Sequence, residues 1–434
     1  MRSGSLLFFT IWIFCTCGVL FSMDNVYVLN TLSQNLSVVN PATGDVTPDA
    51  AALGLYTNDI KIRNNRIYVA NSGINEIQVI DINSLQTVNR FDTGTGTNPY
   101  LMEFINDSSI AVTLLFTNEV AFINLESGEI TKIQTGSGPT GLKYTDGLLY
   151  VCNTNFITFG EYGPGTIDVI DPSTLTHVDT ITVGTNPNLI DVNSAENFFV
   201  LSTGNYADIP SKIFRLDKFS HEVTDSISIQ GDPSLSNMFI DQLDRMFMTL
   251  SSSDEYGNII VYDLDKSEFI KGGSDPLLGG PGIAVDRDGK VYAADFGTDS
   301  LFVYDTNLNR TNSYLVGDGP LALALHPDLQ TAVEYRKDQN ALVKDFRLLN
   351  NYPNPFNGST TIQYELNHAT HVNLSIYSLN GQKISSIIDA NQSAGKYSLQ
   401  WPGNKAAIST ATGTYILRLQ TEYGAATKKL NYIK

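Results

Sequence analysis

The most regular feature of the sequence is a repeated alternation of short apolar runs and polar breaks. In the clearest copy, the run 67–71 (Ile-Tyr-Val-Ala-Asn) is followed after four residues by 76–81 (Glu-Ile-Gln-Val-Ile-Asp). Runs of this length that are rich in Val, Ile and Tyr predict β-strands. This repeated phrase, an apolar run, a polar break and a second apolar run, occurs seven times. Its apolar triplets begin at Val26, Ile67, Ile110, Leu149, Phe198, Met246 and Val291.

These copies follow one another at a nearly constant spacing. Successive triplets begin 41, 43, 39, 49, 48 and 45 residues apart. Each interval also holds two further strand-like runs, separated by Asp-Gly or Asn-containing turns. Four short strands in a period of about 40–50 residues are typical of propeller blades. The sequence therefore predicts an all-β fold, a seven-bladed β-propeller with four-stranded blades.

The first and last units are incomplete in a complementary way. If the four strands of a unit are named A to D, the chain starts with a B strand at 26–30 and ends with an A strand at 321–326. Pairing these terminal strands would close the ring and leave no unpaired edge. The runs 331–335 and 341–346 could instead form an eighth, incomplete unit or alternative closing strands. Equal numbers of A and B strands favour seven blades.

Charge and pattern both change near residue 347. The formal net charge of the 434 residues is −18, yet residues 347–434 hold eight Lys/Arg against three Asp/Glu. The acidic remainder argues against nucleic acid as a partner, because it repels phosphates. Alternating runs and closely spaced turns predict a small C-terminal β-sandwich over 347–434. We therefore expect a propeller at 23–346, followed by this sandwich.

The N-terminus has the pattern of a secretory signal. Residues 1–22 combine an early arginine with an apolar run that is too short for a comfortable membrane span. No integral membrane span is expected once this segment is removed. Of the three cysteines, only Cys152 would then remain, so no intramolecular disulfide is expected.

Two parts of the chain resemble known families. The Tyr-Val-Ala-Asn strand followed by a Val-Ile-Asp strand resembles the YVTN family of seven-bladed β-propellers over residues 26–325. Residues 352–357 (Tyr-Pro-Asn-Pro-Phe-Asn), with Gly-Thr-Tyr at 413–415 and the terminal Lys434, resemble the type A C-terminal sorting domain of the Por (type IX) secretion system of Bacteroidetes and relatives. That resemblance implies export by the type IX machinery through residues 347–434, and a secreted or surface-attached protein.

The loops between strands B and C vary most in length. The loop at 72–75 has four residues, whereas three successive copies have 154–165, 203–211 and 251–257. Because the strands alternate in direction, the B-to-C and D-to-A loops should surround one mouth of the propeller. The candidate ligand-binding residues are the aromatic rings and carboxylates of the long loops: Phe156, Phe159, Glu161, Tyr162, Tyr206, Asp208, Asp254, Glu255 and Tyr256.

No catalytic set, metal site or cofactor is predicted. The starts of the A strands, where a propeller enzyme would gather His, Asp and Glu, hold Tyr100, Thr140, Asn188, Ser234, Gly282 and Leu321. We favour a non-enzymatic module that binds a surface ligand, glycan or protein. The alternatives are an extracellular enzyme with a site at the central channel, because similar propellers include lyases, lactonases and dehydrogenase-like proteins, and a scaffold subunit of a surface complex.

Overall fold

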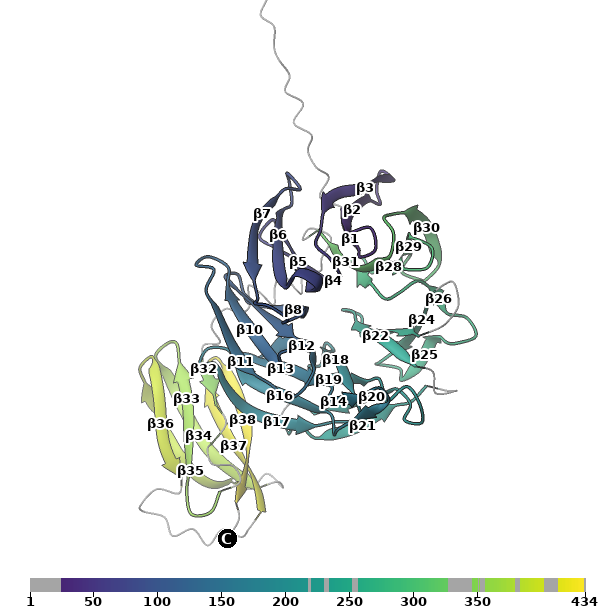
Figure 1. The fold of residues 1–434 in the computed structure, drawn as a ribbon. Coiled ribbons are helices and arrows are strands. Elements are labelled where there is room, and N and C mark those ends of the chain that lie inside the picture. Colours follow the sequence, from purple (N-terminus) through teal and green to yellow (C-terminus); the bar gives the residue numbers. More distant parts are fainter. Residues whose placement is uncertain are drawn as a thin grey trace, which may run out of the picture.

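The computed structural model describes residues 25–217, 220–229, 234–251, 257–326, 346–349, 351, 356–378, 383–401 and 413–432. The described residues between 26 and 325 form seven antiparallel sheets of four or five strands, which we number as blades 1 to 7, and one two-stranded hairpin. Figure 1 shows these sheets set around a central axis, each with one strand innermost. The predicted all-β propeller is confirmed.

Blades 1 to 3 follow the predicted A-to-D order from the centre outward. Blade 1 contains β31 (Pro320–Leu325), β1 (Val26–Asn30), β2 (Asn35–Asn40) and β3 (Asp45–Ala52). Blade 2 contains β4 (Thr57–Arg63), β5 (Arg66–Asn71), β6 (Glu76–Asp81) and β7 (Thr87–Asp92), with the short 3-10 turn η1 (Ser72–Ile74). Blade 3 contains β8 (Pro99–Asn106), β9 (Ser109–Leu114), β10 (Glu119–Asn124) and β11 (Ile130–Gln134).

Blades 4 to 7 repeat this order with additions. Blade 4 contains β12 (Pro139–Thr145), β13 (Leu148–Asn153), β16 (Thr166–Asp171) and β17 (Thr176–Thr182), plus the hairpin β14 (Phe156–Thr158) and β15 (Glu161–Tyr162). Blade 5 contains β18 (Pro187–Val192), β19 (Phe198–Ser202), β20 (Lys212–Leu216) and β21 (Val223–Ile227). Blade 6 contains β22 (Leu235–Ile240), β23 (Arg245–Leu250), β24 (Asn258–Asp263), β25 (Glu268–Lys271) and the added β26 (Leu277–Leu278). Blade 7 contains β27 (Ile283–Val285), β28 (Val291–Asp295), β29 (Ser300–Tyr304) and β30 (Arg310–Leu315).

Blade 1 joins the two ends of the propeller chain. Its innermost strand, β31, pairs antiparallel with β1 from Val26 opposite Leu325 to Asn30 opposite Pro320. Strand β1 would otherwise expose an unpaired edge, which is a site for aggregation. The predicted pairing of the last A strand with the first B strand is therefore present.

The asparagine that ends the repeated phrase holds the neighbouring loop in place. Asn71 is fully buried, accepts a hydrogen bond from the Gly54 backbone N–H at 3.2 Å and donates to the Gln78 amide oxygen at 2.9 Å. A Cβ at Gly54 would lie 2.6 Å from the Asn71 Cγ, so the close approach requires glycine. A Cβ at Gly136 would likewise lie 2.8 Å from the Asn153 Cγ, but the Gly136 N–H donates to the Asp168 carboxylate. In the Asn71 copy, the phrase therefore anchors a loop as well as forming strands.

The hydrophobic core of the propeller lies between adjacent blades. Tyr68 and Ile77 of blade 2, for example, pack in one cluster with Ile110 and Val112 of blade 3. Full burial of such an aliphatic side chain contributes about 1.5–3 kcal/mol. Polar links cross the same boundary, since Asp59 accepts a hydrogen bond from the Met102 N–H at 2.9 Å. Each blade is therefore stabilised by its neighbours.

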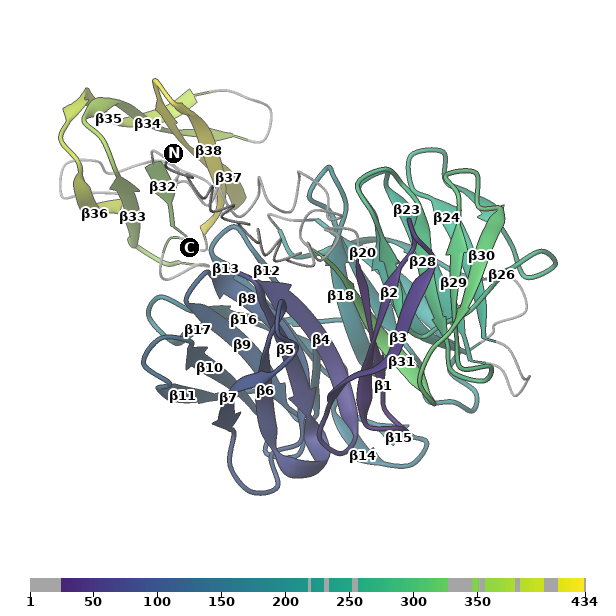
Figure 2. The same ribbon diagram turned by 90° about the horizontal axis from the view of Figure 1, so that it is seen from above.

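The C-terminal domain is a two-sheet sandwich with its own core. One sheet contains β32 (Phe346–Leu348), β33 (Thr360–Leu366) and β36 (Gly395–Trp401). The other contains β35 (Lys383–Gln392), β34 (Thr370–Ser378), β37 (Gly413–Thr421) and β38 (Gly424–Tyr432). Phe356 is buried between the rings of Trp401 and Tyr432, at centroid distances of 5.8 and 5.2 Å. The aromatic residue of the Pro-Asn-Pro-Phe motif is therefore a core residue. Figure 2 shows the strands of this domain.

Three predictions fall wholly or largely on segments outside the description. The signal segment 1–22, the alternative strand 331–335 and all but the last residue of 341–346 lie outside the described residues, and Phe346 begins β32. In the described part of the chain, no helix reaches the length and apolar character of a membrane span.

Candidate functional site

The loops between strands B and C and those between D and A lie on one side of the propeller, which we call the loop face. In blades 1 to 6 the first residue of the B-to-C loop donates its backbone N–H to a carbonyl of the D-to-A loop. The bonds are Thr31 to Gly319, Ser72 to Tyr56, Leu115 to Asn98, Thr154 to Gly138, Thr203 to Asn186 and Ser251 to Ser234, at 2.7–3.1 Å. The two loop sets therefore form one continuous surface around the mouth.

The long loop of blade 4 is an ordered hairpin, which projects from the loop face in Figure 2. Phe156 of β14 and Tyr162 of β15 face each other, with ring centroids 5.6 Å apart in an edge-to-face arrangement. Phe159 at the tip is 87% exposed and Glu161 is also exposed. The hairpin therefore presents an aromatic pair, a free phenyl ring and a carboxylate to solvent.

The long loop of blade 5 is fixed by one asparagine. Asn205 accepts hydrogen bonds from the backbone N–H groups of Ala207, Asp208 and Ile209, and its amide donates to the Asp208 carboxylate at 2.7 Å. Tyr206 adopts a φ of +59° and stays 50% exposed. This left-handed conformation is unusual for an aromatic residue, so the Asn205 bonds hold Tyr206 where it contacts solvent.

Tyr206 affects the pKa of two other tyrosines, Tyr162 and Tyr100. Burial raises the pKa of Tyr162, and the charge of Tyr206 raises it further. Burial likewise raises the pKa of Tyr100, on the innermost strand β8, with smaller contributions from Tyr206 and Asp59. Tyr206 thus lies within electrostatic range of both groups. Sequence reasoning treated Tyr100 only as the start of an A strand and did not connect it with Tyr206.

The structure brings together residues from two of the three long loops. Phe156, Phe159, Glu161 and Tyr162 share one hairpin, and Tyr206 and Asp208 lie in the next blade. The remaining candidates, Asp254, Glu255 and Tyr256, lie outside the described residues.

Exposed apolar side chains occur on this face well beyond the long loops. Every described B-to-C loop carries at least one, and the loop between blades 1 and 2 adds two more. The residues are Leu32, Leu55, Tyr56, Ile74, Phe116, Phe156, Ile157, Phe159, Tyr206, Ile209 and Phe296. Exposed apolar residues gathered on one face mark interaction surfaces. A search for long loops alone misses the exposed residues of the short loops, such as Leu32 and Phe116. Their regular position in each repeat could have indicated them.

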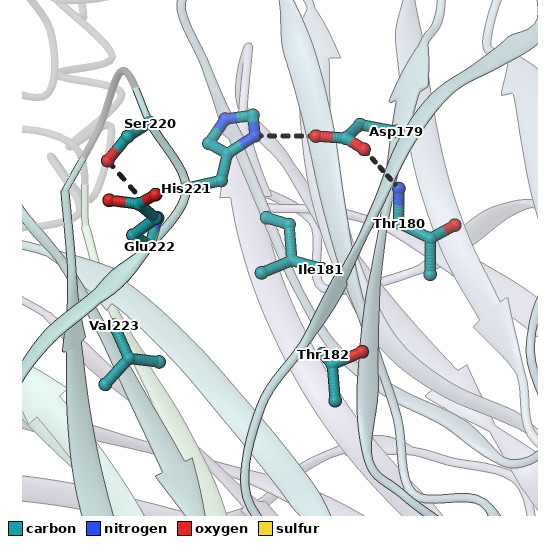
Figure 3. A pocket seen from close by; sticks show the side chains of 8 residues that line it. All are labelled: Asp179, Thr180, Ile181, Thr182, Ser220, His221, Glu222 and Val223. Atoms are coloured by element: carbon teal, nitrogen blue, oxygen red, sulfur yellow. Dashed lines mark hydrogen bonds and ion pairs between the residues drawn. The ribbon is translucent and has the colours of Figure 1, made fainter. Parts of the chain in front are cut away.

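A second feature is a groove of 520 Å³ between blades 4 and 5, lined by residues 179–182 and 220–223 (Figure 3). His221 Nδ1 lies 3.0 Å from the Asp179 carboxylate, and its Nε2 lies 3.4 Å from the hydroxyl of the buried Tyr150. Asp179 and Tyr150 belong to blade 4, whereas His221 lies on a turn of blade 5. The arrangement therefore links two blades.

Replacing His221 with Ala tests this link. The hydrogen bond from His221 holds the pKa of Asp179 below its ordinary value of 3.8. We expect the substitution to lower the unfolding free energy by about 1 kcal/mol, since Asp179 is half-exposed. The part due to Asp179 should be present above pH 4 and disappear as the pH falls through the lowered pKa.

Urea unfolding at pH 7 and pH 3 measures this effect. The control is His177→Ala, which removes a single bond from an exposed ring to the Gln134 carbonyl. An equal loss for both variants at pH 7, or a larger loss for His221→Ala at pH 3, would contradict the assignment.

Candidates for metal or thiol chemistry are few. In the parts of the chain that the structure covers, no group of three His, Cys, Asp or Glu is placed to hold a metal ion. Cys152 is fully buried, and burial raises the pKa of its thiol. The recurrent Asp residues at the ends of C strands cap turns, as Asp81 does by accepting the Asn83 and Ser84 N–H groups.

Comparison with known proteins identifies the C-terminal domain. Residues 350–433 match the family described as the secretion system C-terminal sorting domain. The C-terminal sandwich is a sorting domain. It implies export by the type IX secretion system, and the protein is therefore secreted or attached to the cell surface.

The propeller resembles proteins with diverse functions. The chain is 23% identical over 251 residues to Antigen Lp49 of Leptospira interrogans, covering 56% of this chain and 53% of that protein. It thus spans about half the length of this curated relative. A 6-phosphogluconolactonase-like protein of Bacteroides uniformis aligns with a TM-score of 0.54 at 11% identity, over 70% of this chain and 100% of its own. Streptogramin B lyase aligns with a TM-score of 0.51 at 11% identity, over 70% and 96%. Such low identities establish the propeller fold alone.

Proposed function

We propose that this YVTN-type, seven-bladed propeller is a non-enzymatic binding module that acts outside the cell, with the loop face as its binding surface. The observation that carries the proposal is the set of exposed aromatic rings, including Phe156, Phe159 and Tyr206, on ordered loops of one face. Exposed rings on a rigid scaffold supply large contact area at low entropic cost. The name of the relative Antigen Lp49 agrees with an exposed location.

The order of these loops supports a binding role. The β14–β15 hairpin and the Asn205 network fix backbone that could otherwise be loose. A preorganised surface loses less conformational freedom when a ligand binds. Enzymatic activity at the central channel has no comparable support, because the lyase and lactonase-like neighbours share only the fold.

Array binding tests the proposal. The full chain, the triple variant Phe156→Ser/Phe159→Ser/Tyr206→Ser and the control Leu243→Ser are applied to glycan and peptide arrays. Leu243 is 55% exposed on a turn of the opposite side and gives a matched loss of apolar surface. We expect a set of probes that the wild type and the control bind and the triple variant loses, with signals reduced at least about tenfold, since buried aromatic anchors dominate interfaces.

Two results would contradict this function. One is equal binding of all probes by the triple variant and the wild type. The other is that the wild type binds no probe on either array.

A further inference from the structure

The loop face has an unusual charge composition. Its fourteen B-to-C and D-to-A loops, taken between the strand bounds, contain no Lys, Arg or His. Their described parts contain five acidic residues: Glu161, Asp208, Asp275, Asp299 and Asp318. The described turns of the opposite side, in contrast, carry Lys266, Arg287 and Lys290 together with acidic residues. Positive charge is thus excluded from the loops of one side only.

Nearby bases are already paired with carboxylates of the strands or, for Lys271, of a loop. Three ion pairs flank the loop face: Arg90 with Glu76, Lys132 with Glu119 at 3.7 Å, and Lys271 with Asp275 at 2.7 Å. Lys212, at the start of β20, is the remaining base at a strand end on this side. Lys271 therefore neutralises Asp275, and the other described loop acids set the charge of the face.

The described loop acids accept hydrogen bonds from neutral groups or face solvent. Asp299 accepts the Gly319 N–H at 2.9 Å and Asp208 accepts the Asn205 amide, while Glu161 and Asp318 are exposed. None of these four forms an ion pair with a Lys or Arg among the residues that the structure covers. The negative charges add, and such a surface attracts positively charged partners over several ångströms.

The apolar residues of the same loops restrict the class of partner further. Leu32, Ile74, Phe116 and Phe296 lie on short loops, so exposed apolar area is distributed around the mouth and not confined to blades 4 and 5. An apolar face surrounded by acids complements a polypeptide that offers Lys or Arg beside aliphatic or aromatic side chains. Nucleic acid and anionic lipid would be repelled.

We propose that the loop face binds a cationic, amphipathic polypeptide segment of a partner protein. This inference rests on the proposed function, because it assigns a ligand class to the same surface. The apolar residues would supply most of the contact area, and the carboxylates would orient the segment and accelerate its approach.

The test is a fluorescence titration of the full chain with defined synthetic peptides. One 15-residue peptide contains Lys and Leu in amphipathic order, a second replaces Lys with Glu, and a third replaces Leu with Ser. We expect only the Lys/Leu peptide to bind, with an affinity that falls about tenfold or more between 50 and 500 mM NaCl because salt screens the charges.

Two variants separate the contributions of charge and apolar area. Glu161→Gln/Asp208→Asn/Asp318→Asn should weaken the Lys/Leu peptide about tenfold, whereas the control Glu126→Gln/Asp265→Asn/Asp288→Asn, on exposed turns of the opposite side, should not change it. The triple variant Phe156→Ser/Phe159→Ser/Tyr206→Ser should lose the interaction.

The outcomes distinguish the two proposals. No binding of the Lys/Leu peptide, equal effects of the two charge variants, or face-dependent binding of glycans or the Glu/Leu peptide instead would overturn the inference and leave the binding face in place. Absence of any array probe whose binding depends on Phe156, Phe159 and Tyr206 would overturn the proposed function itself.

Discussion

Deletion of residues 346–434 should abolish the appearance of the protein outside the cell while the propeller still folds. The sorting domain contributes a complete core of its own, from Leu348 and Phe356 to Trp401 and Leu430, that contains no propeller side chain. Removing it therefore takes away the export signal without opening a cavity in the blades. Immunoblots of cell and extracellular fractions, in a host with a type IX system, measure the distribution.

A point variant tests whether export requires the sorting domain to be folded or only requires its sequence to be present. Phe356→Ala removes a buried ring that contacts Trp401 and Tyr432, and it should destabilise the sandwich by about 3–5 kcal/mol. Export should fall strongly. Ile384→Ser, at a side chain 37% exposed in the same domain, is the control and should be exported normally. Extracellular levels of the deletion variant equal to those of the wild type would refute the sorting role.

Leu325→Asp should destabilise the propeller by about 4 kcal/mol or more, because a carboxylate would be buried in an apolar cluster without a partner. Leu325 is 3% exposed, lies opposite Val26 in the β1–β31 pair and packs with Val28 and Leu323. The substitution acts on blade 1, the sheet in which the first and last strands of the propeller pair. Chemical unfolding gives the loss of stability.

Hydrogen exchange locates this effect. In Leu325→Asp, amide protection in Val26–Asn30 should decrease before protection in the blades farthest from blade 1, because β1 loses its inner partner. Leu325→Met keeps the volume and should cost less than about 1.5 kcal/mol. An unchanged unfolding midpoint for Leu325→Asp would show that the β1–β31 pair is not needed to hold the two ends together.

Most of the architecture could be predicted because each repeat carries its own strand and turn signals. Apolar triplets gave the strand positions, and the match between a first B strand and a last A strand gave the pairing of β1 with β31. The asparagine of the phrase was predictable as a recurring residue, but its contact with Gly54 was not. That contact joins the end of β5 to the loop before β4, and the distance between them depends on how the blade twists.

The candidate site was less predictable because it depends on contacts between repeats. Loop length indicated Phe156, Phe159 and Tyr206, but not that Tyr100, on an inner strand of another blade, lies within electrostatic range of Tyr206. Asp179 and His221 likewise belong to successive blades, and their 3.0 Å contact requires knowing which turn faces which strand. The periodicity of the sequence predicts the order of the blades. Which side chains meet between two blades depends on how one blade is rotated relative to the next.

The most direct test of the binding face is site-specific photo-cross-linking on intact cells that export the protein. A photoreactive phenylalanine derivative replaces Phe159 on the loop face in one sample and Leu243 on the opposite side in the other, since both positions are exposed. Our account predicts a discrete cross-linked product from position 159 and none from position 243. Products of equal yield from both positions, or from position 243 alone, or from neither, would contradict it.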